Sequence, residues 1–309
     1  MDSSERLDRR AMVYIGIALL TWSSAYASIA YALASFTPGE VALARLAIGA
    51  LCFALLMLVK RIPLPARRDW PQLALLGVVG LTVYHLCLNY AETRIASGTA
   101  SILIALVPAA TAAVSALWIG ERLPTRTLIG LGVALVGVVM VVLASGKQVK
   151  FEPRAALVLI SVLATAIYFV GQKPLFARCS MIAVTAFTFV AATLATLPFG
   201  WRLPQALVIA PRSHVAALLW LGVAPTFIGY LAWNAALRRA SASQLSTFLY
   251  LSPPIVVLIG WVWLGERPAL LTLVGGGIII GGVLLANARR RQDATERRSA
   301  ASGRACKLP

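Results

Sequence analysis

Residues 118–122 read Trp-Ile-Gly-Glu-Arg, and residues 263–267 read Trp-Leu-Gly-Glu-Arg, 145 positions later. The same offset joins further identical residues: Gly77 and Gly222, Asn89 and Asn234, Arg94 and Arg239, Pro108 and Pro253, Gly130 and Gly275, Gly132 and Gly277, and Gly137 and Gly282. Because this register is held over about 60 residues, it indicates an internal repeat.

The composition places both copies of the repeat in a membrane. The chain has 309 residues, of which 60% are hydrophobic and 13% charged, and its mean hydropathy is +0.83. The stretch 11–39 contains no Asp, Glu, Lys, Arg or His. Since about 20 apolar helical residues span the hydrocarbon core, such stretches predict transmembrane helices.

The apolar windows predict an all-α integral membrane protein with ten transmembrane helices, arranged as two inverted five-helix repeats. The windows are 11–34, 38–59, 70–91, 95–118, 124–144, 154–176, 181–199, 213–237, 242–264 and 268–288. The first repeat covers 11–144 and the second 154–288, followed by a basic tail at 289–309. An odd number of spans in each copy inverts the second copy relative to the first. Inverted repeats are typical of proteins that open one central site to either side of a membrane in turn.

The net charge of +17 follows the predicted topology. Twenty of the 28 Lys and Arg residues fall in the loops and tails on the side of the N-terminus, and seven fall on the other side. By the positive-inside rule, both termini are cytoplasmic. The charge is therefore assigned to the lipid bilayer, with the tail against anionic lipid, and not to nucleic acid.

These features resemble the drug/metabolite transporter superfamily, EamA type. The resemblance rests on ten spans in two halves, each with a Gly-Glu-Arg turn after its fourth helix and a glycine-rich fifth helix. Trp22-Ser23 in the first span, and Pro38 with Arg45 in the second, also fit that pattern. The aromatic content resembles the YddG-like exporters of aromatic and other neutral amino acids. The resemblance implies a transporter of the cytoplasmic (inner) membrane. We expect it to be a monomer or a homodimer and to need no cofactor or metal.

Polar and aromatic side chains within the spans are the candidate substrate-binding residues. Thr82, His85 and Asn89 share one helical face in span three, and Thr226, Tyr230 and Asn234 share one in span eight. We expect these two faces to line a common cavity. The candidates are Trp22, Tyr26, Tyr84, His85, Asn89, Tyr168, Tyr230, Trp233 and Asn234. The alternatives are hydrogen bonds between helices for the two asparagines, packing or proton relay for His85, and interfacial anchoring for the aromatic residues.

Two prolines and two charged residues also lie within the predicted spans. Pro108 and Pro253 occupy equivalent places in spans four and nine, where they serve either as hinges for alternating access or as static kinks. Glu40 lies near the outer membrane boundary, where water can solvate it. Arg45 lies about two turns deep, where it either snorkels outward or contacts a substrate carboxylate. The glycines of spans five and ten permit close helix packing or a dimer contact.

The sequence favours a transporter over other classes of protein. An enzyme would need a convergent nucleophile, base or metal set, and the chain has two histidines and neither a CxxC pair nor a nucleotide-binding loop. A channel would need a continuous polar lining. The function we predict is export of neutral aromatic or hydrophobic amino acids by alternating access. The alternatives are another small metabolite, such as a nucleoside or a drug-like amphiphile, and more remotely a membrane-embedded enzyme or channel.

Overall fold

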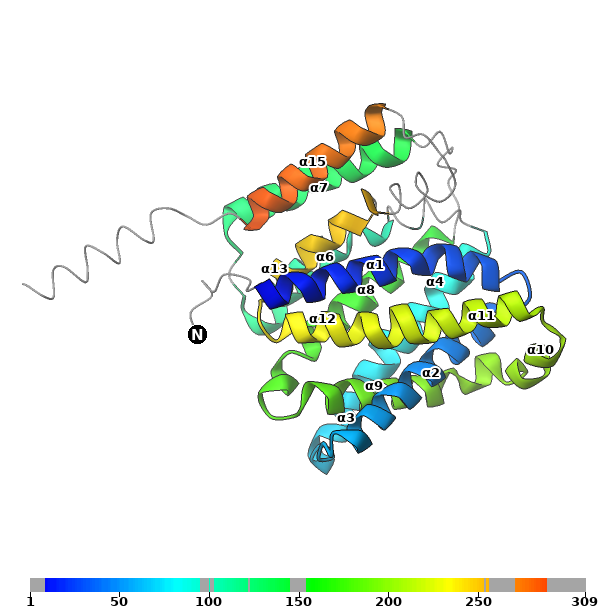
Figure 1. The fold of residues 1–309 in the computed structure, drawn as a ribbon. Helices are drawn as coiled ribbons and strands as arrows, with labels where there is room; N and C mark the ends of the chain where they lie inside the picture. Colours follow the sequence, from blue (N-terminus) through cyan, green and yellow to red (C-terminus); the bar gives the residue numbers. More distant parts are fainter. Residues whose placement is uncertain are drawn as a thin grey trace, which may run out of the picture.

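The computed structural model describes residues 9–94, 100, 103–121, 123–144, 154–252, 254–255 and 270–287, and within them every regular element is a helix (Figure 1). Six stretches are long and apolar enough to cross a membrane: Arg9–Ala32, Pro38–Val59, Arg67–Glu92, Ala156–Ala177, Met181–Gly200 and Arg212–Leu237. Shorter apolar helices cover residues 107–119, 125–140 and 273–286. The all-helical membrane fold is therefore confirmed, while much of the predicted ninth span lies outside the described residues.

The two halves are built from corresponding helices. The first half contains α1 (Arg9–Ala32), α2 (Pro38–Val59), η1 (Arg67–Asp69), α3 (Trp70–Leu76), η2 (Gly77–Val83), α4 (Tyr84–Glu92), α6 (Val107–Ile119) and α7 (Thr125–Ala144). The second half contains α8 (Ala155–Gly171), η3 (Pro174–Ala177), α9 (Met181–Gly200), α10 (Leu203–Ile209), α11 (Arg212–Leu221), η4 (Gly222–Ile228), α12 (Gly229–Leu237), α13 (Ala242–Ser246), η5 (Thr247–Leu251) and α15 (Leu270–Asn287).

The third and eighth spans each contain a π-helical turn at the same place in the repeat. The π-helix η2 joins α3 to α4, and the π-helix η4 joins α11 to α12. Both ends of η4 lie 145 positions after the ends of η2. A π-helical turn inserts extra backbone into an α-helix and often marks a functional site. The two insertions therefore belong to the repeat itself.

Helices of the two halves pack in a reciprocal pattern (Figure 1). Helix α1 contacts the spans of α11, η4 and α12, while its counterpart α8 contacts those of α3, η2 and α4. The second helices of the halves, α2 and α9, pack against each other. This exchange of partners is what an approximate twofold axis between the halves requires.

The fifth helices, α7 and α15, run side by side along one edge of the molecule (Figure 1). A Cβ atom added to Gly137 would lie 2.8 Å from the backbone nitrogen of Ile279, and one added to Gly282 would lie 2.5 Å from that of Ala134. The absence of side chains at these glycines lets the two backbones approach closely. Gly277 and Gly281 meet nothing within 4 Å, so they are not part of this contact.

Two predictions about the spans need revision. Glu40 is 6% exposed and not solvated as expected, because it forms a capping box at the start of α2: its Oε2 accepts from the Thr37 amide at 2.8 Å. The fourth span is interrupted by a turn at Ala105 and Leu106, so Pro108 lies in the first turn of α6 and not inside a continuous helix. Proline is favoured there because its missing amide hydrogen costs no hydrogen bond. Pro253 lies outside the described residues.

Replacing Gly77 by alanine is expected to destabilise the protein by about 1–3 kcal/mol, because the new Cβ would lie 2.3 Å from the Thr188 carbonyl oxygen. Gly132 is the matched control, since a Cβ there meets nothing within 4 Å. Its replacement by alanine is expected to leave stability unchanged or to raise it slightly. Thermal unfolding in detergent compares the two variants, and equal melting temperatures would contradict the close packing of η2 on α9.

Candidate functional site

A small, partly open cavity lies among helices from both halves. Its volume is about 70 Å³, which holds a few water molecules. The lining residues are Trp22, Ala25, Tyr26, Ile29, Arg45, Tyr84, Leu88, Ile104, Val107, Thr165, Phe169, Tyr230, Leu249 and Ser252. These come from α1, α2, α4, α6, α8, α12 and η5, together with residues 104 and 252. The first and third helices of both halves thus meet at this cavity.

Trp22 contacts several of the aromatic residues that line the cavity; Trp22, Tyr26, Tyr84, Phe169 and Tyr230 together form its aromatic wall. Its Nε1 donates to the Pro225 carbonyl at 2.8 Å, within the π-helical turn η4. Its ring centroid lies 5.3 Å from that of Tyr230 and 6.2 Å from that of Phe169. A Cβ at Gly229 would lie 2.6 Å from Trp22 Nε1, so glycine is needed for this close approach. The π-helical turn and Gly229 together position the indole beside the cavity.

Four of the predicted substrate-binding residues line the cavity, namely Trp22, Tyr26, Tyr84 and Tyr230. Three of them are tyrosines, so they combine flat apolar rings with hydroxyl groups. Such side chains suit a solute that has both an apolar part and polar groups.

Tyr168 and Trp233 lie behind this wall and do not line the cavity. Tyr168 is buried, its hydroxyl lies 3.2 Å from Thr188 Oγ1, and its ring centroid lies 6.0 Å from that of Tyr230. Trp233 is fully buried, with its ring centroid 5.1 Å from that of Trp22. Both residues therefore support cavity side chains from the second layer.

The two asparagines bond to neighbouring helices in place of the cavity lining that we expected. Asn89 Nδ2 donates to the Pro38 carbonyl at 3.1 Å. Asn234 Nδ2 donates to Thr185 Oγ1 at 2.9 Å, and its Oδ1 accepts from Gln172 Nε2 at 3.0 Å. Tyr84 and Leu88, which line the cavity, each precede one of the expected residues, His85 and Asn89, by one position. One position corresponds to a rotation of about 100° around the helix, so His85 and Asn89 face away from the cavity. The amide face of span three therefore points toward α2.

His85 is also separated from the cavity lining. It is 0% exposed, and among the described residues neither ring nitrogen has a hydrogen-bond partner. Its ring lies against Tyr84, with centroids 4.7 Å apart. A buried polar ring without a partner costs stability, so His85 does not act as a hydrogen bond between helices within the described residues.

Two charged residues outside the list of candidate binding residues also bear on the site, and the sequence had suggested a substrate contact for one of them, Arg45. Arg45 of α2 lines the cavity and is 3% exposed, and its Nε donates to Thr226 Oγ1 at 3.2 Å. Glu92 ends α4, and both of its carboxylate oxygens are buried without a partner among the described residues. The signal for Arg45 was available in the sequence, since it is the only charged residue between Glu40 and Lys60.

The described residues contain no group of three His, Cys, Asp or Glu side chains able to hold a metal ion. The cavity lining likewise supplies aromatic rings, hydroxyls and one guanidinium. This set of groups can bind a small organic solute without a cofactor.

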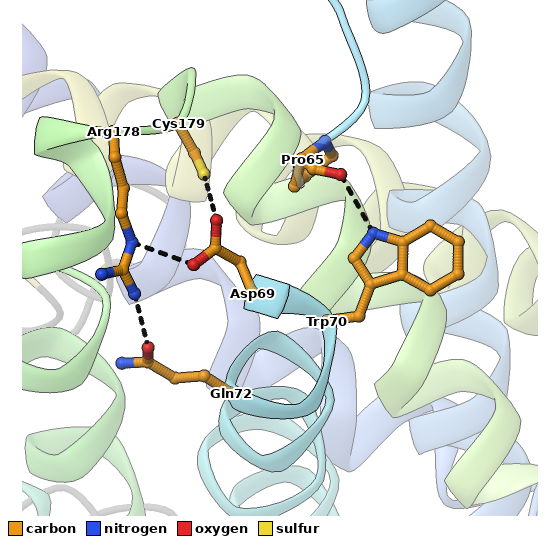
Figure 2. Close-up of polar contacts among 6 residues, drawn as sticks. All are labelled: Pro65, Asp69, Trp70, Gln72, Arg178 and Cys179. Carbon is orange, nitrogen blue, oxygen red and sulfur yellow. Dashed lines mark hydrogen bonds and ion pairs between the residues drawn. The ribbon is translucent and has the colours of Figure 1, made fainter. Parts of the chain in front are cut away.

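A polar cluster joins the two halves at the loop ends of α3 and α9 (Figure 2). Arg178 Nε lies 2.9 Å from Asp69 Oδ1, and Arg178 Nη2 donates to Gln72 Oε1 at 2.9 Å. Cys179 Sγ donates to Asp69 Oδ2 at 3.5 Å. The Asp69 side chain is 4% exposed, so its charge depends on these partners.

Burial, followed by the hydrogen bond and negative charge of Asp69, raises the pKa of the Cys179 thiol. Because the thiolate is the reactive form, alkylation of Cys179 is expected to be slow near pH 8. Asp69→Asn removes the charge, lowers the pKa toward its ordinary value and should speed alkylation by several-fold there. Mass spectrometry of maleimide labelling between about pH 6 and pH 10 measures this. Gln72→Ala is the control, and identical profiles for Asp69→Asn and the unmodified protein would contradict the role of Asp69.

Comparison with known proteins identifies the fold and its family. The model of the EamA-like transporter family matches residues 9–143 and again residues 154–288. The chain belongs to the EamA-like transporter family. The two matches begin and end 145 positions apart, as the repeated residues do. This EamA-family chain is therefore a multi-pass membrane transporter and not an enzyme.

Several relatives share most of their length with this EamA-family chain. A "Probable terminal-alkyne amino-acid exporter" from Streptantibioticus cattleyicolor is 32% identical over 93% of this chain and 97% of its own length. The uncharacterized transporter YdfC of Bacillus subtilis is 31% identical over 85% of this chain and 86% of its own. The pseudopaline exporter CntI of Pseudomonas aeruginosa is 30% identical over 85% of this chain and 91% of its own.

A solved crystal structure shares the fold of this EamA-family chain. Its TM-score is 0.71 at 22% sequence identity, and the match covers 89% of this chain and 96% of the other. At this identity the likeness supports the arrangement of the helices and not the substrate.

Proposed function

We propose that this EamA-family transporter exports neutral amino acids with aromatic or other hydrophobic side chains across the cytoplasmic (inner) membrane. The observation that carries the proposal is the cavity, which is walled by Trp22, Tyr26, Tyr84, Phe169 and Tyr230. Their rings complement an apolar side chain, and their hydroxyls can bind polar groups. The Streptantibioticus relative, whose name gives terminal-alkyne amino acids as its probable cargo, supports an amino acid as the substrate.

The transport mechanism follows from the repeat. Two halves of equivalent fold, 11–144 and 154–288, would rock about the cavity between them, which opens to each side in turn. Pro108 at the broken fourth span is our proposed hinge in the first half, with Pro253 as its counterpart. The charge distribution supports cytoplasmic termini, with the tail 289–309 at the lipid surface, and the active species is a monomer or homodimer. Because the cavity holds only a few water molecules, loading an amino acid requires its walls to move apart.

A second candidate function is export of another small metabolite, such as a nucleoside or a drug-like amphiphile. The Pseudomonas relative is similar in identity to the Streptantibioticus protein, yet its name gives pseudopaline as the cargo. Relatives at this distance therefore differ in what they carry.

Uptake of labelled phenylalanine into liposomes that contain the purified protein tests the proposal. Without an imposed gradient, we expect saturable uptake that tryptophan and methionine inhibit and nucleosides do not. Uptake that appears only when a pH gradient is applied would still support phenylalanine as a substrate and would show that transport is coupled to protons. His85 and Glu92 would then be the candidate proton-carrying residues. No phenylalanine uptake under either condition would overturn the proposed substrate.

A further inference from the structure

Arg45 is the only charged side chain among the residues that line the cavity. It projects from α2 beside the tyrosine hydroxyls of α1, α4 and α12, and the side chain is almost fully buried. An arginine retains its charge in such an environment. A buried charge is expensive unless an opposite charge or several hydrogen bonds accompany it.

The described residues compensate this charge only in part. Thr226 Oγ1 accepts from Arg45 Nε at 3.2 Å and leaves the two terminal amino groups of the guanidinium for other partners. The ion pair between Arg178 and Asp69 is distant from the cavity and does not involve Arg45. Glu92 interacts electrostatically with Arg45, but none of its oxygens makes an ion pair with the guanidinium. The terminal N–H groups of Arg45 therefore have no ion-pair partner among the described residues at the place where a solute would bind.

We propose that Arg45 binds the carboxylate of the transported solute and makes the cavity selective for carboxylate-bearing molecules. A guanidinium presents two parallel N–H groups that match the two oxygens of a carboxylate. Thr226 holds the Nε edge of the guanidinium and so leaves the terminal N–H groups free for the solute. The aromatic wall around Trp22 then receives the apolar side chain. This inference rests on the proposed function, since it names the group by which an amino acid is recognised.

The roles of the neighbouring groups follow from this arrangement. The ammonium group of an amino acid can lie against the tyrosine ring faces, which attract cations. Glu92 adds negative charge from the end of α4 and acts on that ammonium group over a longer distance. A molecule without a carboxylate would leave Arg45 buried and unpaired, and this cost provides the selectivity.

The test compares L-phenylalanine with L-phenylalaninol, which carries a hydroxymethyl group in place of the carboxylate. In the wild-type protein, we expect phenylalanine uptake to exceed phenylalaninol uptake by at least about tenfold. In Arg45→Gln, phenylalanine uptake should fall at least about tenfold while phenylalaninol uptake is unchanged or rises. Arg45→Lys, which keeps the charge but not the planar pair of donors, should retain an intermediate preference.

The control variant is Arg202→Gln, because Arg202 is exposed and stacks over the Trp201 ring away from the cavity. It should keep the wild-type preference. If Arg45→Gln lowers uptake of both compounds in proportion, or of neither, Arg45 is structural and the inference is wrong while the proposed function stands.

A binding measurement separates failure of this inference from failure of the proposed function. If the wild type transports no amino acid, thermal unfolding in detergent with 3-phenylpropionate still probes the carboxylate subsite. Stabilisation of the wild type but not of Arg45→Gln would support the carboxylate-binding role of Arg45. In that case only the proposal that amino acids are the transported solute would be rejected. The absence of stabilisation in both proteins would overturn the inference as well.

Discussion

Replacing Trp22 by alanine should abolish transport and lower the free energy of unfolding by about 3 kcal/mol. The indole contacts the rings of Phe169, Tyr230 and Trp233 and donates a hydrogen bond to the Pro225 carbonyl. Its loss would remove these contacts from the cavity wall and leave a void between α1 and α12. Phenylalanine uptake into liposomes and thermal unfolding in detergent measure the two effects.

Two further variants separate the function of Trp22 from its contribution to stability. Trp22→Phe keeps an aromatic ring and loses the hydrogen bond to Pro225, so it should retain most of the stability and part of the transport. Trp201→Ala is the matched control, because Trp201 is 62% exposed and lies outside the cavity. A Trp22→Ala protein that transports at the wild-type rate would show that the cavity is not on the transport path.

Deleting Val78 from the π-helical turn η2 should have the second large effect. The deletion lets the third span close into a continuous α-helix, which rotates α4 by about 100° relative to α3. Either Gly77 then leaves the Thr188 carbonyl or Tyr84 leaves the cavity, because both contacts depend on the extra residue. We expect transport to be lost and the melting temperature to fall, although Val78 itself is 38% exposed and contributes little packing.

The control for this deletion removes Leu64, an exposed residue in the loop between α2 and η1. That protein should fold and transport normally. Size-exclusion profiles and liposome uptake are compared for both deletions. Wild-type transport by the Val78 deletion would mean that the π-helical turn has no part in placing the cavity residues.

The architecture was largely predictable because it follows from two simple sequence signals. Long apolar windows identify helices that lipid must surround, and a constant offset of 145 reveals the repeat in so apolar a chain. Neither signal depends on the details of side-chain packing. The break before Pro108 could not be read in the same way, because a proline inside an apolar window can either kink a helix or begin one.

The cavity was only partly predictable, and the reason is geometric. Aromatic residues near the middle of the spans, such as Trp22 and Tyr230, were recognised because they are too bulky and polar for a simple packing role. Asn89 and His85 were placed on the wrong side of span three, since a helical face alone does not say which neighbour it meets. The π-helical turns could not be predicted from a uniform helical period, which does not show where extra backbone is inserted into a span.

The contact between α7 and α15 is reciprocal between the two halves of the chain. Gly137 meets Ile279, and Gly282 meets Ala134. The residues of the second pair lie 145 positions from those of the first, with the two helices exchanged. Reciprocal contacts of this kind define the interface of a symmetric homodimer. The α7–α15 pair therefore has the self-complementary form of a subunit interface, although both helices belong to one chain.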